Sequence, residues 1–271
     1  MFQQLLILSW FAVVLSAISP TMCCAQFGPE FSEQELAAVR ENPDPIRREY
    51  HDETSQDRRT RAYRLLVISR VSGYEQIIRD ARFDPLSQIR VSNSHHLPLV
   101  FNEDELVDEY QRLTNDKNDS ARYNAAESLQ RFPSKRVLPC LVELLGDESI
   151  EVRDRAASSL WRWNWPDMQK RFQVIAESDE LSRAGCATVM LANRFDQKLK
   201  SDVLDRYLAL ELERLVGPPY RGNDNVVRII QVLGQQGTKP SLSVLEKAST
   251  HSHRNVRSEA EKASAQIRLR K

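Results

Sequence analysis

VRDRAASSL, at residues 152–160, recurs in two related forms: ARYNAAESL at 121–129 and SRAGCATVM at 182–190. In each form an Arg is followed three residues later by a pair of small side chains, and seven residues later by a large apolar one. The arginines are 31 and 30 residues apart. A period of about 30 residues with this internal pattern is typical of a helical solenoid, in which every repeat is a pair of helices.

A second apolar segment accompanies each copy of the pattern. Residues 137–145 form one such segment and end at Gly146, and the stripe at 168–175 is its equivalent one repeat later. A glycine followed by acidic residues suits the end of one helix and the start of the next. A looser fourth copy of the pattern covers 256–267. The predicted unit is therefore a helix, a turn, a second helix and an acidic turn.

This arrangement resembles the HEAT family, in particular the HEAT-like repeats of the phycobilisome-lyase subgroup. The resemblance covers roughly Glu103 to Arg268 and is most specific at 120–147 and 150–179. It implies an all-α fold, an α-solenoid of stacked helix-turn-helix HEAT-like repeats, which we place at residues 104–271. Between 196 and 224 the period breaks, and there we expect one long helix, a loop at 217–224, and then a degenerate unit with its turn at Val232–Gly237.

The first 25 residues differ from the rest of the chain. Leu5 to Ile18 is apolar, Pro20 breaks the run, and Ala25 precedes a candidate cleavage site before Gln26. These features predict a signal peptide at residues 1–25 and export to the periplasm or beyond the cell. The run is shorter than the roughly 20 residues that span a bilayer, so we expect no stable membrane span after cleavage. Acylation at Cys23 is the weaker alternative.

Residues 26–60 are rich in charge and proline. A capping box at Ser32–Glu35 predicts a short helix up to Arg40, and the small apolar content of the remainder predicts a mobile tether that could become ordered on a partner. Residues 61–103 are expected to form a helical N-terminal cap, with one or two amphipathic helices up to Asp80 and an irregular loop from Phe83 to Asn102. The cap would precede the repeats.

The recurring arginines Arg122, Arg153, Arg183 and Arg257 could form a ladder along one edge of the stack. The resemblance implies that this position pairs with acidic residues of adjacent turns, for which Asp147 and Asp179 are candidates. A structural ladder is favoured over an anion-binding strip, because Arg and carboxylate groups form strong bidentate pairs.

Trp161, Trp163 and Trp165 form the conspicuous aromatic cluster of the sequence. On a helix Trp161 and Trp165 would share one face, so they could stack against a glycan or another small molecule. The interpretation that we favour is that these rings plug the end of a helix before Pro166.

Of the four cysteines, only Cys140 and Cys186 would remain after cleavage. An exported protein could join them, but both fall at positions predicted to pack inside helices, which favours two buried thiols.

The chain carries 38 basic and 38 acidic residues, so it lacks the net positive charge that nonspecific nucleic-acid binding uses. It has no phosphate-binding glycine loop, no nucleophile elbow and no metalloprotease motif, and its five histidines lack nearby ligand partners. We therefore expect no enzyme, no metal site, no cofactor and no nucleic-acid partner.

The resulting hypothesis is an exported scaffold or adaptor that binds a protein partner and has no catalytic activity. Stacked repeats present extended surfaces suited to such partners. Polar residues between the buried stripes of the second helices are the candidate contacts: Arg136, Glu143, Lys170 and Gln173. The alternative is a glycan- or small-molecule-binding module that uses the Trp161–Trp165 cluster.

Overall fold

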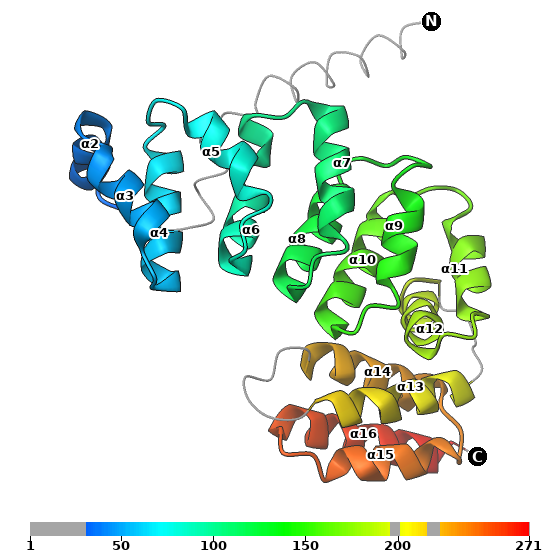
Figure 1. Ribbon diagram of the computed structural model, residues 1–271. Helices are drawn as coiled ribbons and strands as arrows, with labels where there is room; N and C mark the ends of the chain where they lie inside the picture. Colours follow the sequence, from blue (N-terminus) through cyan, green and yellow to red (C-terminus); the bar gives the residue numbers. More distant parts are fainter. Residues whose placement is uncertain (1–30, 196–200, 216–222, 271) are drawn as a thin grey trace, which may run out of the picture. The chain divides into compact units, whose positions relative to one another are not determined.

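The computed structural model describes residues 31–195, 201–215 and 223–270, and within these ranges every regular element is a helix (Figure 1). The chain divides into two compact units on either side of the Val100–Phe101 bond. They are called here the N-terminal unit (31–100) and the C-terminal unit (101–270). The predicted signal peptide lies outside the described residues. None of the described helices is long and apolar enough to cross a membrane.

The N-terminal unit contains five α-helices and a 3-10 turn. They are α2 (Glu33–Glu41), α3 (Asp44–Asp52), α4 (Gln56–Ile68), α5 (Tyr74–Ala81), α6 (Ser87–Ser94) and η2 (Leu97–Leu99). The predicted helices before Asp80 correspond to α4 and α5. Helix α6 and η2 occupy most of the stretch that we expected to be an irregular loop.

The predicted helix after Ser32 is α2, and the Ser32 side chain accepts a bond from the Glu35 N–H. The structure corrects the prediction of a mobile tether beyond it, because residues 41–60 are ordered as the end of α2, α3 and the start of α4. The apolar side chains of residues 31–60 that are buried include Phe31, Leu36 and Tyr50. Helix α4 lies against both preceding helices and supplies the apolar surface that the segment itself lacks. The Glu35–Arg61 ion pair also joins α2 to α4. Long-range burial thus offsets the ordering entropy of this segment.

Polar side chains fill part of the N-terminal unit's core. The Tyr63 hydroxyl donates to Asn93 Oδ1 at 2.6 Å, and Nδ1 of His96 lies 3.3 Å from the same hydroxyl. Asn93 Nδ2 donates in turn to the carbonyl of Ile78 at 3.1 Å. This network joins α4, α5 and α6, and burial lowers the pKa of His96 from 6.5 to about 4, with the nearby His95 and Arg64 acting in the same direction.

Acidification is expected to destabilise the N-terminal unit between pH 6.5 and pH 4. Over that range the unfolded chain protonates His96 while the folded chain keeps it neutral, so stability present above pH 6.5 is lost as the pH falls. The expected loss is about 1–3 kcal/mol. Urea unfolding of the full chain at pH 7 and pH 4.5 measures it, and His96→Gln should show a smaller difference between the two pH values. An equal difference in both proteins would mean that other groups cause the loss.

The C-terminal unit is a stack of paired helices. Its first helices, which carry the repeated pattern or its equivalent, are α8 (Asp119–Leu129), α10 (Ile150–Arg162), α12 (Leu181–Phe195), α14 (Asn223–Gln236) and α16 (Arg254–Leu269). Its second helices are α7 (Glu103–Leu113), which precedes the first complete pair, α9 (Leu138–Leu144), α11 (Met168–Ala176), α13 (Ser201–Arg214) and α15 (Ser241–Ser249). The solenoid prediction is confirmed.

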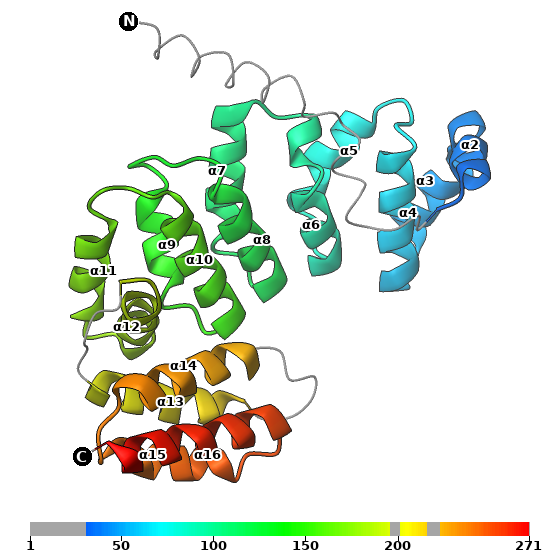
Figure 2. The same ribbon diagram turned by 180° about the vertical axis from the view of Figure 1, so that it is seen from behind.

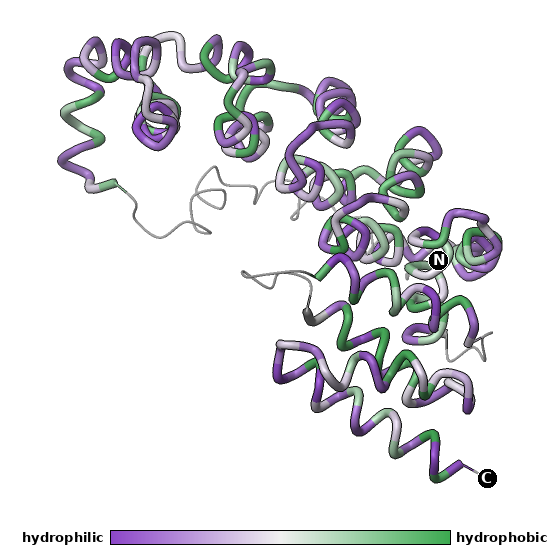
Figure 3. Tube along the Cα trace, turned by 60° about the horizontal axis from the view of Figure 1, so that its bottom comes forward, coloured by the Kyte–Doolittle hydropathy of each residue, from purple (hydrophilic) through white to green (hydrophobic). Residues whose placement is uncertain are grey.

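Small side chains allow the first helices to approach one another. Ala125, Ala126, Ala156 and Ala157 are fully buried where α8 packs against α10. The hydropathy colouring in Figure 3 shows apolar and polar segments alternating along each helix, as expected for elements that bury one face. Both ribbon views show α14 beside α16 (Figures 1 and 2).

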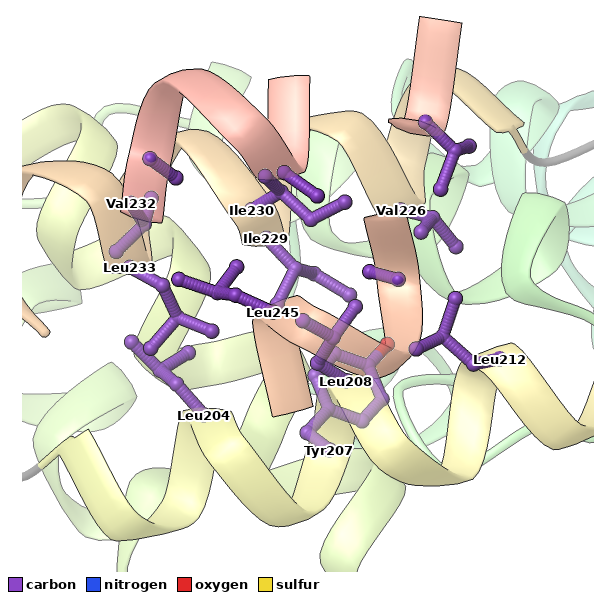
Figure 4. Packing of buried hydrophobic residues seen from close by; sticks show 14 of the residues in the cluster. Leu204, Tyr207, Leu208, Leu212, Val226, Ile229, Ile230, Val232, Leu233 and Leu245 are labelled. Atoms are coloured by element: carbon purple, nitrogen blue, oxygen red, sulfur yellow. The ribbon is translucent and has the colours of Figure 1, made fainter. Parts of the chain in front are cut away.

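The last four helices share one apolar core with α10 and α12. Leu204, Leu208, Ile230 and Leu245 are fully buried in it, and Figure 4 shows them converging from α13, α14 and α15. Helix α14 continues through Val232 to Gln236, which corrects the prediction of a turn at 232–237. The apolar periodicity of α14 outweighs its Gly234, which lies inside the helix. Most of the predicted loop at 217–224 lies outside the described residues.

Candidate partner-binding surface

The repeated arginines connect the turns between successive units. Arg122 on α8 donates through Nε and Nη2 to both carboxylate oxygens of Asp147, at 2.7 and 2.9 Å, and reaches Glu148 at 3.2 Å. Its Nη1 also donates to the Asp116 carbonyl at 2.8 Å. These bonds raise the pKa of Arg122, with the hydrogen bond to Asp147 as the largest cause. The expected pair between the repeated Arg and the next acidic turn is present at this position.

Arg153 has different partners from those predicted. Its side chain is fully buried and forms an ion pair with Glu211 on α13 at 2.5 Å, where Asp179 was expected. Its Nε donates to the Tyr207 hydroxyl at 3.1 Å, and Nη1 donates to the carbonyl of Glu148 at 3.0 Å. Because α13 packs on α12, it brings Glu211 closer to α10 than the α11–α12 turn comes.

The remaining two arginines lie nearer the surface. Arg183 on α12 is close to Glu180 of its own turn, at 3.7 Å. Arg257 on α16 donates to the carbonyls of His251 and Ser252 at 2.7 and 2.6 Å. Like Arg122, it therefore holds the carbonyl six residues before it. In α14 the position equivalent to the repeated arginine is Val226. The spacing identifies it, because the small pair and the large apolar residue of the pattern correspond here to Ile229, Ile230 and Leu233, in place of Ala156, Ala157 and Leu160. The repeated arginines thus fix the turns, and the unit of α14 has no arginine at this position.

The exposed charges of the first helices are used in contacts between helices. Arg155 on α10 lies over the Tyr123 ring of α8 at 4.7 Å and pairs with Glu127 at 3.2 Å. Arg228 on α14 pairs with Asp154 on α10 at 2.6 Å. These contacts hold α8, α10 and α14 together.

The second helices α9 and α11 present a different surface, called here the α9–α11 face. Glu143 and Lys170 are exposed on it, and among the described residues neither forms an ion pair. Val174 on α11 is 70% exposed, which is unusual for an apolar side chain in this unit. Gln173 is half-buried between them. Val174 is a surface feature that the search for polar residues missed, although its position beside Gln173 could have indicated it.

Arg136, the fourth predicted contact, precedes α9. Its exposed guanidinium pairs with Asp108 on α7, and its carbonyl accepts a bond from Gln111 at 3.1 Å. Both partners hold the start of α9 against α7. The structure therefore places all four predicted residues on or beside the second helices, with Arg136 alone in an ion pair.

The tryptophans lie at the end of a helix, as the favoured interpretation predicts, and not on one helical face. Helix α10 ends at Arg162, and Asn164 adopts a left-handed conformation with φ of 48°, so Trp165 leaves the helix. Trp165 packs against Trp163, with ring centroids 4.9 Å apart, while Trp161 lies beside Arg194. Trp163 is buried and donates through Nε1 to the Gln130 carbonyl at 2.9 Å. Trp161 and Trp165 therefore form no shared stacking platform.

Both cysteines in the described residues are free thiols. Burial raises the pKa of Cys186 to about 12, and its sulfur lies 3.7 Å from the Arg153 carbonyl. Cys140 is half-buried and lines an open hollow of about 340 Å³ with Glu143 and Arg183. No group of three potential metal-ligating side chains occurs in the ranges that the structure covers.

Comparison with known proteins agrees with this architecture. A family model described as HEAT repeats matches residues 101–187. No curated protein matches the chain. Among solved structures, the YibA protein of Escherichia coli is 16% identical with a TM-score of 0.41, covering 92% of this chain and 93% of its own. Human deoxyhypusine hydroxylase is 17% identical with a TM-score of 0.36, covering 86% and 98%. A designed armadillo repeat protein is 15% identical with a TM-score of 0.29, covering 91% and 98%.

At these TM-scores the solved structures carry no functional information. The assignment instead combines the matched repeats, the paired helices α7 to α16 and the arginines that fix their turns. Residues 101–187 thus match HEAT repeats, and the paired helices around them form an all-α helical scaffold.

Proposed function

We propose that this protein is an exported adaptor without catalytic activity, which holds a protein partner against the α9–α11 face. The observation that carries the proposal is the contrast between the two sets of helices. The first helices direct Arg155 and Arg228 to neighbouring helices, whereas Glu143 on α9 and Lys170 on α11 are exposed and form no ion pair among the described residues, and the exposed Val174 lies one helical turn from Lys170. Exposed charges near an apolar side chain match the mixed composition of a transient protein interface.

Export is supported by the apolar run from Leu5 to Ile18 and the small residue Ala25, which precedes the candidate cleavage site. The absence of catalysis is supported by the sequence, which offers no set of nucleophile, base and oxyanion-stabilising residues. The finer resemblance to the phycobilisome-lyase subgroup is part of the proposal, and the Val152–Leu160 pattern supports it. Lyase activity is not part of it.

Charge reversal tests the proposed face. The Glu143→Lys/Lys170→Glu variant is expected to bind the partner at least about tenfold more weakly, with an unfolding temperature close to that of the unchanged protein, because both side chains are exposed and unpaired. The partner is first captured with tagged full-length protein from native envelope extract after mild crosslinking. Affinity is then measured with the purified partner.

The matched control is Glu261→Lys/Lys239→Glu, which reverses one acid and one base on exposed positions far along the chain. Equal binding by both variants would exclude the α9–α11 face. A large loss of stability in the first variant would show that its residues are structural. N-terminal sequencing of the mature protein tests export separately: a first residue of Gln26 supports it, and an intact Met1 contradicts it.

A further inference from the structure

The neutral net charge of the chain conceals a separation of charge in the C-terminal unit. One end of the helix stack is the basic edge, where each first helix joins its own second helix: residues 130–136, 161–171 and 193–194. These stretches hold seven basic residues and one acidic residue, namely Arg131, Lys135, Arg136, Arg162, Lys170, Arg171 and Arg194 against Asp167. At the opposite end, residues 114–119, 145–151 and 177–183 hold eight acidic and two basic residues.

Contacts across the basic edge show that it is continuous. Arg162 donates to the Gln130 side chain at 3.3 Å, and Trp163 donates to the Gln130 carbonyl, which together join the first two loops. Arg194 on α12 lies over the Trp161 ring at 5.4 Å and extends the edge to the next unit. Successive antiparallel helices place their connections alternately at the two ends, so the three stretches lie at the same end.

Several cations of this edge are available to a partner. Arg131 and Lys135 are exposed, and within the described part of the chain neither side chain forms a hydrogen bond or an ion pair. Asp167 is the single acidic residue of the edge, and it forms an ion pair with Arg171 at 2.7 Å. The surplus positive charge therefore lacks compensation within the edge, and it would attract an anionic partner.

We propose that the basic edge binds an extended acidic peptide segment, a proposal that rests on the adaptor function and identifies the kind of partner. Arginine guanidinium groups match the geometry of carboxylates in bidentate pairs. Neighbouring helices are about 10 Å apart. An extended peptide rises about 3.3 Å per residue, so a segment of about six residues is long enough to cross the three loops of the edge. Aspartate or glutamate side chains along that segment reach successive cations.

The aromatic rings favour a peptide over an acidic glycan. Sugars are usually held on open aromatic faces, but Trp163 is buried, and Trp165 tilts against it with Arg171 5.5 Å from its ring centre. Trp161 likewise has Arg194 against it. The rings thus serve as supports that position guanidinium groups through cation–π contacts.

Titration with a synthetic peptide tests the inference. The probe is a fluorescent peptide of about 12 residues with glutamate at alternate positions, beside a version in which glutamine replaces each glutamate. The full-length protein is expected to bind the glutamate peptide alone, and more weakly as salt is raised from about 50 to 300 mM. Arg131→Glu/Lys135→Glu should weaken binding at least about tenfold.

The matched control is Lys239→Glu/Arg254→Glu, which reverses one Lys and one Arg at exposed positions away from the edge. Equal weakening by both variants would assign the binding to net charge and overturn the inference, as would binding of the glutamine peptide. Preferential binding of polygalacturonate of equal charge would make the partner a glycan and overturn the peptide. Lys170 belongs to both surfaces, so Glu143→Lys alone separates them. If Arg131→Glu/Lys135→Glu keeps the captured partner while Glu143→Lys loses it, the adaptor function stands and the basic edge does not contribute.

Discussion

Replacement of Arg153 by Met is expected to lower the free energy of unfolding of the C-terminal unit by about 3–5 kcal/mol. The guanidinium is fully buried, and the carboxylate of Glu211 beside it is 2% exposed. Without Arg153, Arg214 is the one basic side chain that still pairs with this carboxylate among the described residues, at 3.1 Å. The Arg214 side chain is itself 38% exposed. The Glu148 carbonyl and the Tyr207 hydroxyl also lose their donor. A buried charge and several polar groups would then lack adequate partners.

The double variant Arg153→Met/Glu211→Leu separates the ion pair from the packing. Replacing both members of a buried pair by apolar groups is often nearly neutral, so the double variant should recover most of the stability lost by the single one. Urea unfolding monitored by far-ultraviolet circular dichroism gives both values. Equal losses in the single and double variants would show that the volume of Arg153, and not its charge, matters here.

The pH dependence gives a second test of the same pair. Burial raises the pKa of Glu211 above its ordinary value, against the lowering effect of Arg153 and Arg214. The folded protein therefore binds this proton more readily than the unfolded chain, and stability falls as the pH rises through the interval between the two pKa values. Without Arg153 the pKa of Glu211 rises further. The loss caused by Arg153→Met should thus be smaller at pH 5 than at pH 8, and a pH-independent loss would contradict this cause.

The repeat pattern predicted the fold because its residues are local. The spacing of Arg153, Ala156 and Leu160 is set within one helix, so periodicity predicts their shared face. The partner of Arg153 could not be predicted in the same way. Glu211 lies two helices further along the chain, in the part where the period breaks, and nothing in its local sequence distinguishes it from the other acidic residues.

The stacking alternative for the tryptophans was wrong because it assumed that the helix continued. Trp161 and Trp165 share a face only if residues 161–165 are helical, but α10 ends at Arg162 and Asn164 turns the chain. Asn is among the few residues that tolerate a left-handed conformation, and Pro166 follows it, so a helix end between Trp161 and Pro166 was the available signal.

Order in residues 41–60 was missed for the opposite reason. Composition measures the apolar surface that a segment carries, whereas Tyr50 is buried by surface that belongs to other helices. Likewise, the charge separation between the two ends of the C-terminal unit disappears when the charges are summed over the chain. The charge separation is visible only when the charges of the loops are counted separately for the two ends of the helix stack.

Gly185→Ala is expected to destabilise the C-terminal unit by about 2–3 kcal/mol, although alanine is the better helix former by about 1 kcal/mol. A Cβ at Gly185 would lie 2.2 Å from Cγ of Tyr207 and 2.7 Å from its Cβ, where α12 crosses α13. The ring cannot move aside easily, because it is buried and its hydroxyl accepts a bond from Arg153 Nε. The helices would have to separate, and urea unfolding measures the resulting loss.

A double-mutant cycle with Tyr207→Ala tests whether the ring causes that loss. In the Ala background Cγ and Cδ1 of residue 207 are gone and only its Cβ, at 2.7 Å, stays close to the added methyl group, so Gly185→Ala should cost less there, and the two changes should be coupled by more than about 1 kcal/mol. Gly234→Ala is the matched control inside α14, because its new Cβ would first meet Oε1 of the exposed Gln266, a flexible end that can rotate away. It should cost less than Gly185→Ala. If the loss persists without the Tyr207 ring, another contact of α12 requires glycine. If Gly185→Ala has no effect on stability, α12 and α13 pack less closely than the 2.2 Å distance between the new Cβ and Cγ of Tyr207 implies.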